Sequence, residues 1–342
     1  MKRILISVLS DYLQPNFLLI KELEGEYDEL IFITTEIMES KNKKKSYWLS
    51  KALKLGNEAG KIVVEEDDYE AVVEALNKEQ FSSENQYIVN LTGGTKVMSI
   101  AVHDYFSKFN PKFYYVPIGK NEIKSINSNE EGIPLKYRMN LVEYFSLHGL
   151  SYKCDNNLTY KKKFTKQFFT KFKDVNFNRS RVPEIIGAQT LANPSDRRYY
   201  GGVWFEEYAY SRLKEELGLN DGQICKSAKI FRETSAENDN EIDVMYVKDN
   251  LLHIFECKVT MSGQGPNKSS AQTIEAVLYK LAAVSKDFGL RVNSYLLTLQ
   301  KIKNNEKNFS EKKLELLEKR KSILGIKAIL DSSDFKQQKL SI

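Results

Sequence analysis

The stretch Glu241–Thr260, EIDVMYVKDNLLHIFECKVT, has the pattern of two short strands joined by a tight turn. Residues Glu241–Val247 and Leu251–Val259 are rich in Ile, Val, Phe and Tyr, which favour strands. Asp249 and Asn250 tolerate the positive φ angles that a two-residue hairpin turn requires. The sequence therefore predicts a β-hairpin with its turn at these two residues.

The predicted pairing gives the hairpin a charged face and an apolar face, because side chains alternate along a strand and paired residues share a face. Asp243 lies opposite Glu256 in this register, and Lys258 projects from the same face. The other face is expected to enter a core and carries Ile242, Val244, Tyr246, Phe255 and Cys257.

The charged face has the groups that a divalent cation prefers. Two carboxylates opposed across a hairpin repel each other unless a positive charge lies between them. Mg²⁺ or Mn²⁺ takes oxygen ligands and commonly uses one or two carboxylates, water and substrate phosphate. The predicted ligands are Asp243, Glu256 and the backbone carbonyl of Cys257. Lys258 is placed to orient an attacking water or to neutralise charge on the phosphorane in phosphodiester hydrolysis. The alternative interpretation is a solvated hairpin face with one surface ion pair.

A helix is predicted upstream of the hairpin, opening at Gly201–Tyr210 (GGVWFEEYAY) and continuing to about Gly218. Glu206 borders its inner stripe, whereas Glu207 is expected on the wetter side. The inner stripe, at helical spacing, consists of Phe205, Tyr208, Ala209, Arg212 or Leu213, and Glu216 or Leu217. The elements expected after the hairpin are a helix over Ala271–Phe288 and a strand over Asn293–Leu299.

The first part of the chain alternates apolar strand-like runs with helical patterns, which predicts a mostly parallel, Rossmann-like sheet. Strands are expected over Arg3–Leu9, Glu29–Thr35, Lys61–Val64, Tyr87–Leu91 and Phe113–Pro117. Helices are expected over Phe17–Leu23, Lys41–Ala59, Asp68–Leu76 and Lys96–Phe109. The fold class is therefore α/β, with one domain at residues 1–150 and a second at residues 151–342.

The fourth predicted strand runs into a polar, glycine-containing turn, Asn90–Lys96 (NLTGGTK). Free N–H groups and the helix dipole favour an anion where a strand gives way to a helix N-terminus. Gly93 and Gly94 are expected to let a ligand approach the backbone closely. The spacing matches neither the dinucleotide nor the P-loop pattern, so an ordinary cofactor or NTP site is not indicated. The alternative interpretation is a Thr-capped helix after a glycine turn.

A Rossmann-like domain with NLTGGTK, followed by GGxWFEE, EID and ECK, resembles the CRISPR ancillary nucleases that join a CARF domain to a PD-(D/E)xK nuclease domain. The resemblance covers nearly the whole chain, although Ile242 stands where that family usually has proline. It implies a cyclic oligoadenylate activator, in particular cyclic tetra-adenylate, made by a type III CRISPR complex. It also implies a homodimer with the activator on the two-fold axis between CARF domains.

The resemblance assigns roles to particular positions. The implied catalytic set is Glu206, Asp243, Glu256 and Lys258. The implied activator-binding positions are Ser10 after the first strand, Thr34 and Thr35 after the second, and Asn90, Thr92, Gly93, Gly94, Thr95 and Lys96 at the fourth. Gln14, Asn16 and Glu36 lie at the same rim. A HEPN ribonuclease, the other common partner of CARF domains, needs an arginine shortly before a histidine, and neither His103, His148 nor His253 has one.

Composition adds limits on the class of protein. The net charge of +5 permits a nucleic-acid partner without requiring one. Cys154, Cys225 and Cys257 are dispersed, so neither a disulfide framework nor a Cys-ligated zinc site is expected. The apolar run Ile4–Leu9 is too short for a signal peptide core or a membrane span. We therefore expect a cytoplasmic protein with no membrane association.

A basic and aromatic stretch, Tyr160–Arg181, leads into the second domain. Its phenylalanines Phe164, Phe168 and Phe172 recur every four residues, which favours an amphipathic helix with a buried aromatic face and lysines free to contact phosphate. The alternative is an aromatic residue that stacks on nucleic acid. Arg197–Tyr200 (RRYY) is a second such cluster.

Three functions remain open from the sequence. The first is an activator-gated, metal-dependent endonuclease for single-stranded DNA, RNA or both, with nicking of supercoiled DNA as a further activity. The second is a CARF-type sensor, regulator or scaffold with a weak or inactive nuclease domain. The third is a restriction or repair nuclease whose first domain binds another ligand. The complete set of Glu206, Asp243, Glu256 and Lys258 favours the first.

Overall fold

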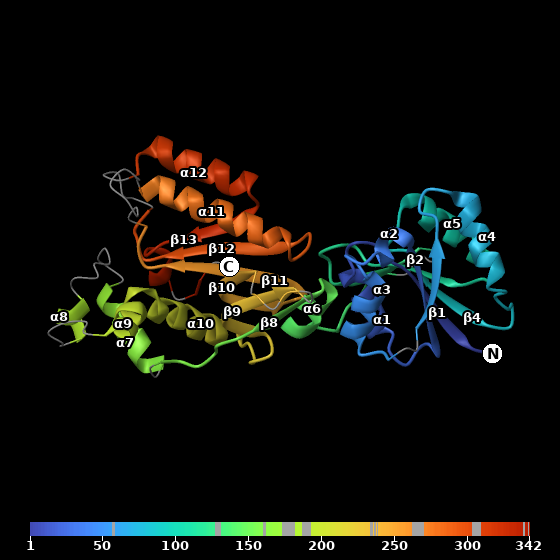
Figure 1. The fold of residues 1–342 in the computed structure, drawn as a ribbon, viewed down its shortest axis with the longest axis horizontal. Coiled ribbons are helices and arrows are strands. Elements are labelled where there is room, and N and C mark those ends of the chain that lie inside the picture. Colours follow the sequence, from blue (N-terminus) through green and yellow to red (C-terminus); the bar gives the residue numbers. More distant parts are fainter. Residues whose placement is uncertain are drawn as a thin grey trace. The chain divides into compact units, whose positions relative to one another are not determined.

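The computed structural model describes residues 1–56, 59–126, 131–159, 162–172, 182–186, 193–232, 235, 237, 239–261, 270–302, 309–337, 339–340 and 342. The chain divides into two compact units, Met1–Ser151 and Tyr152–Ile342 (Figure 1). Each contains helices packed on a mixed sheet, which confirms the predicted α/β class.

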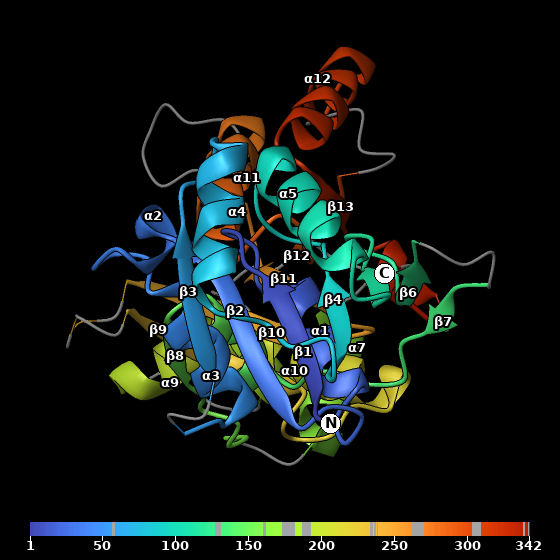
Figure 2. The same cartoon turned by 90° about the vertical axis from the view of Figure 1, so that its right-hand side faces the viewer.

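The first unit is built on a seven-stranded sheet in the order β3-β2-β1-β4-β5-β6-β7. Its strands are β1 (Arg3–Val8), β2 (Glu29–Thr35), β3 (Gly60–Val64), β4 (Gln86–Asn90), β5 (Lys112–Tyr115), β6 (Glu122–Ser125) and β7 (Ile133–Pro134). The first five pair in parallel, and β6 and β7 add an antiparallel edge. Figure 2 shows β3, β2, β1 and β4 side by side. The strand order reverses between β1 and β4, and ligands of open α/β sheets bind at such a point.

Helices cover both faces of this sheet. They are α1 (Gln14–Glu22), α2 (Glu36–Glu39), α3 (Lys45–Leu53), α4 (Tyr69–Lys78), α5 (Lys96–Ser107) and α6 (Leu141–Leu147). In Figure 1, α1 and α3 lie on one side of β1 and β2, and α4 and α5 lie on the other. The predicted helix over Lys41–Ala59 is shorter in the structure, because Lys44 and Lys54 have left-handed backbone conformations at its two ends.

The second unit is built on a six-stranded sheet in the order β13-β12-β11-β10-β9-β8. Its strands are β8 (Leu150–Lys153), β9 (Ile224–Arg232), β10 (Asn240–Lys248), β11 (Leu251–Lys258), β12 (Val292–Thr298) and β13 (Ile326–Leu330). The pairs β9–β10 and β10–β11 are antiparallel, and β11–β12 and β12–β13 are parallel.

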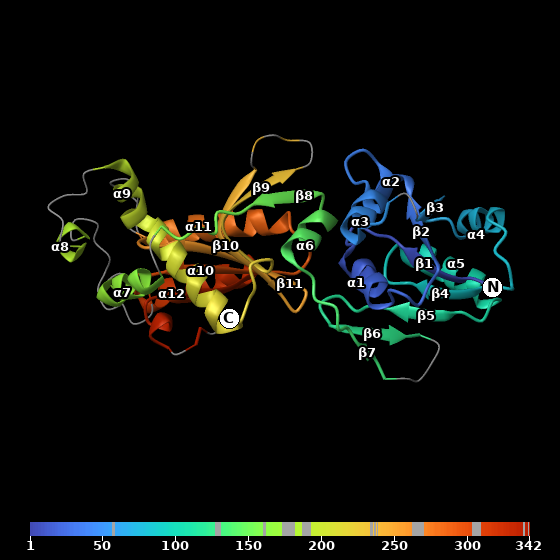
Figure 3. The ribbon, with the colours of Figure 1, turned by 90° about the horizontal axis from the view of Figure 1, so that it is seen from below.

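Helices again lie on both faces. They are α7 (Lys162–Phe172), α8 (Val182–Ile186), α9 (Pro194–Arg198), α10 (Trp204–Leu217), α11 (Ser270–Lys286) and α12 (Glu311–Ile323), with the short turns η2 (Tyr199–Val203) and η3 (Asp334–Lys336). Figures 1 and 3 show α10 on one face of the sheet, and α11 and α12 on the other.

The predicted hairpin is confirmed as β10 and β11. Its pairing runs from Lys248↔Leu251 to Val244↔Phe255, the predicted register. Asp249 and Asn250 form the turn with φ angles of 50° and 62°. The predicted apolar face is buried, and most of it packs in one core with residues of α10.

The helix that carries Glu206 begins earlier than Gly201. It starts at Pro194, after the cap residue Asn193, and passes through the π-helical turn η2 into α10. In that turn the N–H of Trp204 donates to the carbonyl of Tyr199, five residues back.

Glu207 does not lie on a wetter side, so that expectation was wrong. Its side chain is fully buried because α7 covers this side of α10. Its carboxylate accepts hydrogen bonds from the N–H of Thr159 at 2.7 Å and the hydroxyl of Tyr199 at 3.2 Å. Glu207 is therefore a structural residue.

The basic and aromatic stretch is described only in part. Phe168 is buried as predicted, and the neighbouring Phe169 stacks on Tyr208 with ring centroids 4.0 Å apart. The side chains of Phe164, Phe172 and Phe177 lie outside the described residues. In the RRYY cluster both tyrosines are buried, so only the arginines are exposed.

The cysteines depart from expectation, because Cys154 and Cys225 form a disulfide that joins the residue after β8 to β9. Spacing in the sequence gave no sign of this pair, which only the pairing of β8 with β9 brings together. Cys257 is a buried free thiol. Among the helices in the described part of the chain, none is long and apolar enough to cross a membrane.

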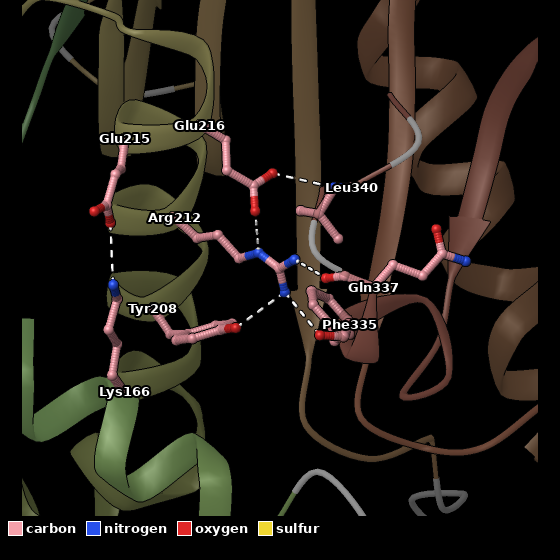
Figure 4. Close-up of polar contacts among 8 residues, drawn as sticks. All are labelled: Lys166, Tyr208, Arg212, Glu215, Glu216, Phe335, Gln337 and Leu340. Atoms are coloured by element: carbon pink, nitrogen blue, oxygen red, sulfur yellow. Dashed lines mark hydrogen bonds and ion pairs between the residues drawn. The ribbon is translucent and has the colours of Figure 1, made fainter.

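Arg212 of α10 fastens the end of the chain to the second unit (Figure 4). Its guanidinium donates to Glu216 at 2.6 Å, to the Tyr208 hydroxyl at 3.1 Å, and to the carbonyls of Phe335 and Gln337 at 3.0 and 2.8 Å. Glu216 in turn accepts the N–H of Leu340 at 3.1 Å. The C-terminal segment is thus held by hydrogen bonds that replace water around a buried cation.

Candidate functional site

The structure brings the three charged side chains of the hairpin together. The Nζ atom of Lys258 lies 2.6 Å from Oε1 of Glu256 and 3.6 Å from Oδ2 of Asp243. Burial lowers the pKa of Lys258, but the charges of Asp243 and Glu256 outweigh it and raise that pKa above its ordinary value. Lys258 is therefore a permanent cation between two carboxylates.

The strands β10 and β11 part at this point. Their backbone pairing ends at Val244↔Phe255, and the Oδ2 atom of Asp243 accepts the N–H of Cys257 at 2.7 Å. Beyond the fork β11 stays paired with β12, and β10 stays paired with β9. The Asp243 carboxylate thus accepts a hydrogen bond from a backbone N–H of β11 that has no backbone partner on β10. This bond fixes the position of the carboxylate.

Glu206 approaches the same cluster from α10. Burial, and then the charge of Asp243, raise the pKa of Glu206 to about 8. The hydroxyl of Ser227 on β9 donates to its Oε2 atom at 3.4 Å. Burial, and then the charge of Glu256, raise the pKa of Asp243 to about 6. Burial is thus the larger cause of both raised pKa values, and a neighbouring carboxylate adds to it in each case.

Two further residues belong to this neighbourhood, and the sequence motif does not contain them. The Nζ atom of Lys280 on α11 lies 3.3 and 3.4 Å from the two carboxylate oxygens of Glu256. Ser227 has a φ of 48°, a conformation that costs free energy in a non-glycine residue and clusters at functional sites. Lys280 was predicted only as part of a helix. Its position about three helix turns into α11 was the available signal, but using that signal requires the start of the helix to be known first.

The residues present fit a Mg²⁺ or Mn²⁺ ion. Asp243 and Glu256 offer carboxylate oxygens from neighbouring strands, and the carbonyl of Cys257 lies 3.4 Å from the Nζ atom of Lys258. Within the described residues no cluster of three or more His, Cys, Asp or Glu side chains is close enough to hold a metal. Two carboxylates completed by water and substrate oxygens are the ligand set that Mg²⁺ commonly uses.

The predicted activator residues gather at the edge where β1, β2 and β4 end, because the carboxyl ends of parallel strands share an edge. The buried ones are hydrogen-bonded within the protein. Asn90 donates to the hydroxyl of Ser7 at 3.1 Å and accepts from the N–H and hydroxyl of Thr92 at 3.1 and 2.5 Å. Asn16 donates to Ser7 at 2.9 Å, and Gln14 accepts from the hydroxyl of Tyr12. Through Asn90, these hydrogen bonds connect the turn after β4 to Ser7 of β1.

The glycines of the turn pack closely on β1, and this packing is a reason for glycine that is separate from the predicted approach of a ligand. A Cβ atom on Gly93 would lie 2.1 Å from the carbonyl oxygen of Val8. Gly94 has a φ of +77°, and a Cβ atom there would lie 2.6 Å from the Val8 side chain. Neither position accepts another residue without a shift of the turn.

Thr95 is the N-cap of α5, as the Thr-capped interpretation predicted. Its hydroxyl accepts the N–H of Met98 at 3.2 Å and donates to the carbonyl of Glu66 at 2.5 Å. Lys96, at the first position of α5, is exposed. Lysine and free helix N–H groups at one strand end suit an anion.

The end of β2 is polar in the same way. Thr34 donates to Glu39 at 2.9 Å, and Thr35 caps α2 by accepting the N–H of Met38 at 3.3 Å. Glu36 is exposed, and the half-buried Ser10 donates to the carbonyl of Tyr12 at 3.4 Å. The predicted residues that reach the surface of this edge are thus Ser10, Glu36, Thr92, Gly94, Thr95 and Lys96.

Residues 4–144 match the family model of the Card1 CARF domain, and residues 194–329 match that of the Card1-like endonuclease domain. The chain pairs a Card1 CARF domain with a Card1-like endonuclease domain. This confirms the resemblance seen in the sequence. The endonuclease match begins at Pro194, where the helix that leads to Glu206 starts.

Solved structures share the fold of the whole chain. Can2 from Sulfobacillus thermosulfidooxidans, in complex with cyclic tetra-adenylate, is 21% identical with a TM-score of 0.74 over 97% of each chain. Protein VC1899 from Vibrio cholerae is 14% identical with a TM-score of 0.71, over 98% of this chain and 95% of that one.

A type III CRISPR defence DNA nuclease activated by cyclic oligoadenylate is 13% identical with a TM-score of 0.58, over 88% of this chain and 46% of that one. No curated protein matches this chain in sequence. At these identities the solved structures establish the fold, and the two family models establish the domains.

Proposed function

We propose that the protein is a divalent-metal-dependent endonuclease that a cyclic oligoadenylate activates in type III CRISPR antiviral defence. Cyclic tetra-adenylate is the expected activator, and single-stranded DNA, RNA or both are the expected substrates. The observation that carries the proposal is the Lys258 ammonium held between Asp243 and Glu256 in a chain whose other unit is a CARF domain. Cyclic tetra-adenylate bound to the similarly folded Can2 supports the choice of activator.

The chain's own residues divide the work of phosphodiester hydrolysis. Asp243, Glu256 and the Cys257 carbonyl would hold Mg²⁺ or Mn²⁺. Such an ion stabilises the charge that develops on the phosphate and lowers the pKa of bound water. Lys258 supplies a fixed cation within reach of both carboxylates and orients the water that attacks. Glu206 adds a carboxylate with a raised pKa, which suits a group that accepts or returns a proton near neutral pH.

The activator is proposed to bind at the edge of the first sheet formed by the ends of β1, β2 and β4. The N-terminus of α5 and the Lys96 ammonium offer positive charge there for phosphates. A homodimer would present two copies of this edge to one ring. Sedimentation of the purified protein tests the dimer directly, and a monomer at micromolar concentration would contradict it.

The decisive experiment incubates a labelled single-stranded oligonucleotide with the protein and Mn²⁺, with and without cyclic tetra-adenylate. Cleavage is expected only with both. Asp243→Asn is expected to abolish cleavage and leave activator binding intact, because it removes a charged oxygen ligand but keeps the shape of the side chain. Asp221→Asn, at an exposed aspartate paired with Lys214, is the matched control and should cleave normally. Full activity in Asp243→Asn would refute the proposed site.

A further inference from the structure

One face of α11 is exposed and lies beside the proposed cleavage site. Its exposed residues, called here the α11 face, are Gln272, Ala276, Tyr279, Lys280, Ala283 and Lys286. Their spacing places them on one side of a helix. The other sides are occupied, since Ile274, Leu278 and Leu281 are buried and Glu275 pairs with Arg320 of α12 at 2.8 Å.

Lys280 connects this face to the carboxylates. Its Nζ atom lies 3.3 and 3.4 Å from the two Glu256 oxygens, and its side chain is 54% exposed. A cation placed so is within reach of a phosphate that is close to the bond to be cut. The side chains of the α11 face therefore begin where the chemistry is proposed to occur.

Tyr279 is the unusual member of the α11 face. It is 52% exposed, and among the described residues its ring contacts no other ring. The exposed residues one turn before and after it are alanines, Ala276 and Ala283, whose small side chains take up little room beside the ring. An open aromatic ring next to a lysine is the combination that proteins use for single strands, in which bases stack on rings while cations follow the phosphates.

We propose that the α11 face binds the substrate strand next to the scissile bond. Lys280 contacts a phosphate, and Tyr279 stacks on an unpaired base. This inference rests on the proposed function, because it assumes that Asp243 and Glu256 mark the cleavage site. Charge complementarity favours nucleic acid as the occupant, since Lys258 and Lys280 both lie at the carboxylates and Lys286 is in the last turn of the same helix. Stacking requires an unpaired base, so the face selects single strands over duplex.

The test measures binding and cleavage separately. Binding of a fluorescent single-stranded DNA, and in a second arm RNA, is followed by anisotropy in the Asp243→Asn background. KM and kcat are measured in the active protein. Tyr279→Ala is expected to weaken binding and raise KM about 5- to 150-fold, the range for the loss of one stacked base, while Tyr279→Phe stays close to wild type.

Lys280→Gln is expected to reduce the slope of log affinity against log salt concentration by about 0.7, the value for one lost phosphate contact to a single strand. Lys280→Arg should retain that slope. Lys319→Gln is the matched control on α12, where the lysine is exposed, and should change nothing.

An abasic substrate identifies the stacked position. Removing the base that Tyr279 contacts should weaken wild-type binding about as much as Tyr279→Ala does, and should have no further effect in Tyr279→Ala. If both variants bind single strands with wild-type affinity and salt dependence, or if duplex binds equally well, the inference is wrong even when cleavage stands. If instead wild type never cleaves with activator and metal, the proposed function is wrong, while the binding data still decide the role of this face.

Discussion

Lys258 lies between two carboxylates whose repulsion it relieves, and this position separates its role from theirs. Removing its ammonium leaves Asp243 and Glu256 with more uncompensated negative charge. Lys258→Ala is therefore expected to lower kcat about 100-fold or more while the affinity for Mn²⁺ is equal or higher. Calorimetric titration of Mn²⁺ checks this. A weaker affinity in Lys258→Ala would show that the lysine organises the ligands rather than the attacking water.

His253 offers a prediction about stability at the same scale. It is stacked between Tyr246 and Tyr295, whose hydroxyls lie 3.1 and 3.3 Å from its Nδ1 atom. Burial lowers the pKa of His253 to about 4, with further effects of Lys248, Asp249 and Lys327. Between pH 6.5 and 4 His253 binds a proton in the unfolded chain but not in the folded chain. The free energy of unfolding therefore falls as the pH falls.

The expected loss from this one group is about 1.4 kcal/mol per pH unit within that window. His253→Gln keeps an acceptor for the tyrosines but does not titrate, so urea denaturation of this variant should show a flatter dependence on pH between 6.5 and 4. The comparison uses slopes, because the substitution also changes the absolute stability. An unchanged slope would mean that His253 does not carry this effect.

Single residues also show what the sequence can predict. Asp249 and Asn250 specify their turn locally, and the turn then determines which residues oppose each other, so the cluster of Asp243, Glu256 and Lys258 followed from the pattern. The choice between Glu206 and Glu207 as the more buried side chain could not be made from helical spacing. The burial of Glu207 depends on α7, which packs on the side of α10 that lies outside the predicted apolar stripe.

At the scale of elements, the end of the chain depends on α10 through Arg212. This residue is 9% exposed and holds two backbone carbonyls, a tyrosine hydroxyl and Glu216. Arg212→Ala removes the donor of both carbonyls and leaves Glu216 with only the N–H of Leu340. The expected loss of unfolding free energy is about 3 kcal/mol.

Arg212→Lys should recover only part of that loss, because an ammonium does not reproduce the planar arrangement of donors. Arg198→Ala, at an exposed arginine of α9, should change stability by less than about 0.5 kcal/mol. Urea denaturation of the three variants checks the order. Equal stability of Arg212→Ala and Arg198→Ala would contradict the clamp.

The disulfide between Cys154 and Cys225 is a second tie between elements. The two cysteines are 71 residues apart, and closing a loop of that length stabilises the folded state by about 4 kcal/mol in the chain-entropy model. Denaturation with and without dithiothreitol should show this difference, and Cys154→Ser should abolish it. Equal denaturation midpoints with and without dithiothreitol would show that the disulfide contributes nothing to the free energy of unfolding.

Elements with strong local patterns were predicted, and elements that depend on neighbours were missed. The strands β1, β2 and β4 are short apolar runs, and their edges agree with prediction within a residue. The strand β9 was not predicted, because its lysines at 226 and 229 break the apolar pattern. Lys226 is nevertheless buried, since α10 packs against β9 and Lys226 lies near Glu206 of that helix.

At the scale of the whole molecule, the proposed activator edge and the proposed cleavage site belong to different units. Coupling between them requires that the activator bind one arrangement of the protein better than another. Lys96→Glu is expected to raise the activator concentration for half-maximal cleavage about 10-fold or more, because it places a negative charge beside phosphates. The metal dependence of cleavage at saturating activator should not change.

Lys112→Glu is the matched control, since it makes the same charge change at an exposed residue where β5 begins, away from the strand ends. Thr95→Ala is a poorer reporter, because it also removes the cap of α5 at a cost of about 1 kcal/mol. Superimposed activation curves for Lys96→Glu and wild type would exclude the α5 N-terminus as the activator site.

The π-helical turn at Tyr199–Val203 has a consequence for how this helix tolerates insertions and deletions. Such a turn holds one residue more than an α-helical turn, so it is a point where the helix has already absorbed an insertion. Deleting Gly202 would therefore convert the π-helical turn into an ordinary α-helical turn and leave the residues on either side in phase. Arg197 and Arg198 would keep the side of the helix on which they lie, and Glu206 would keep its place at the site. A deletion of one residue within the regular helix α10 would instead rotate one part of it by about 100° against the other.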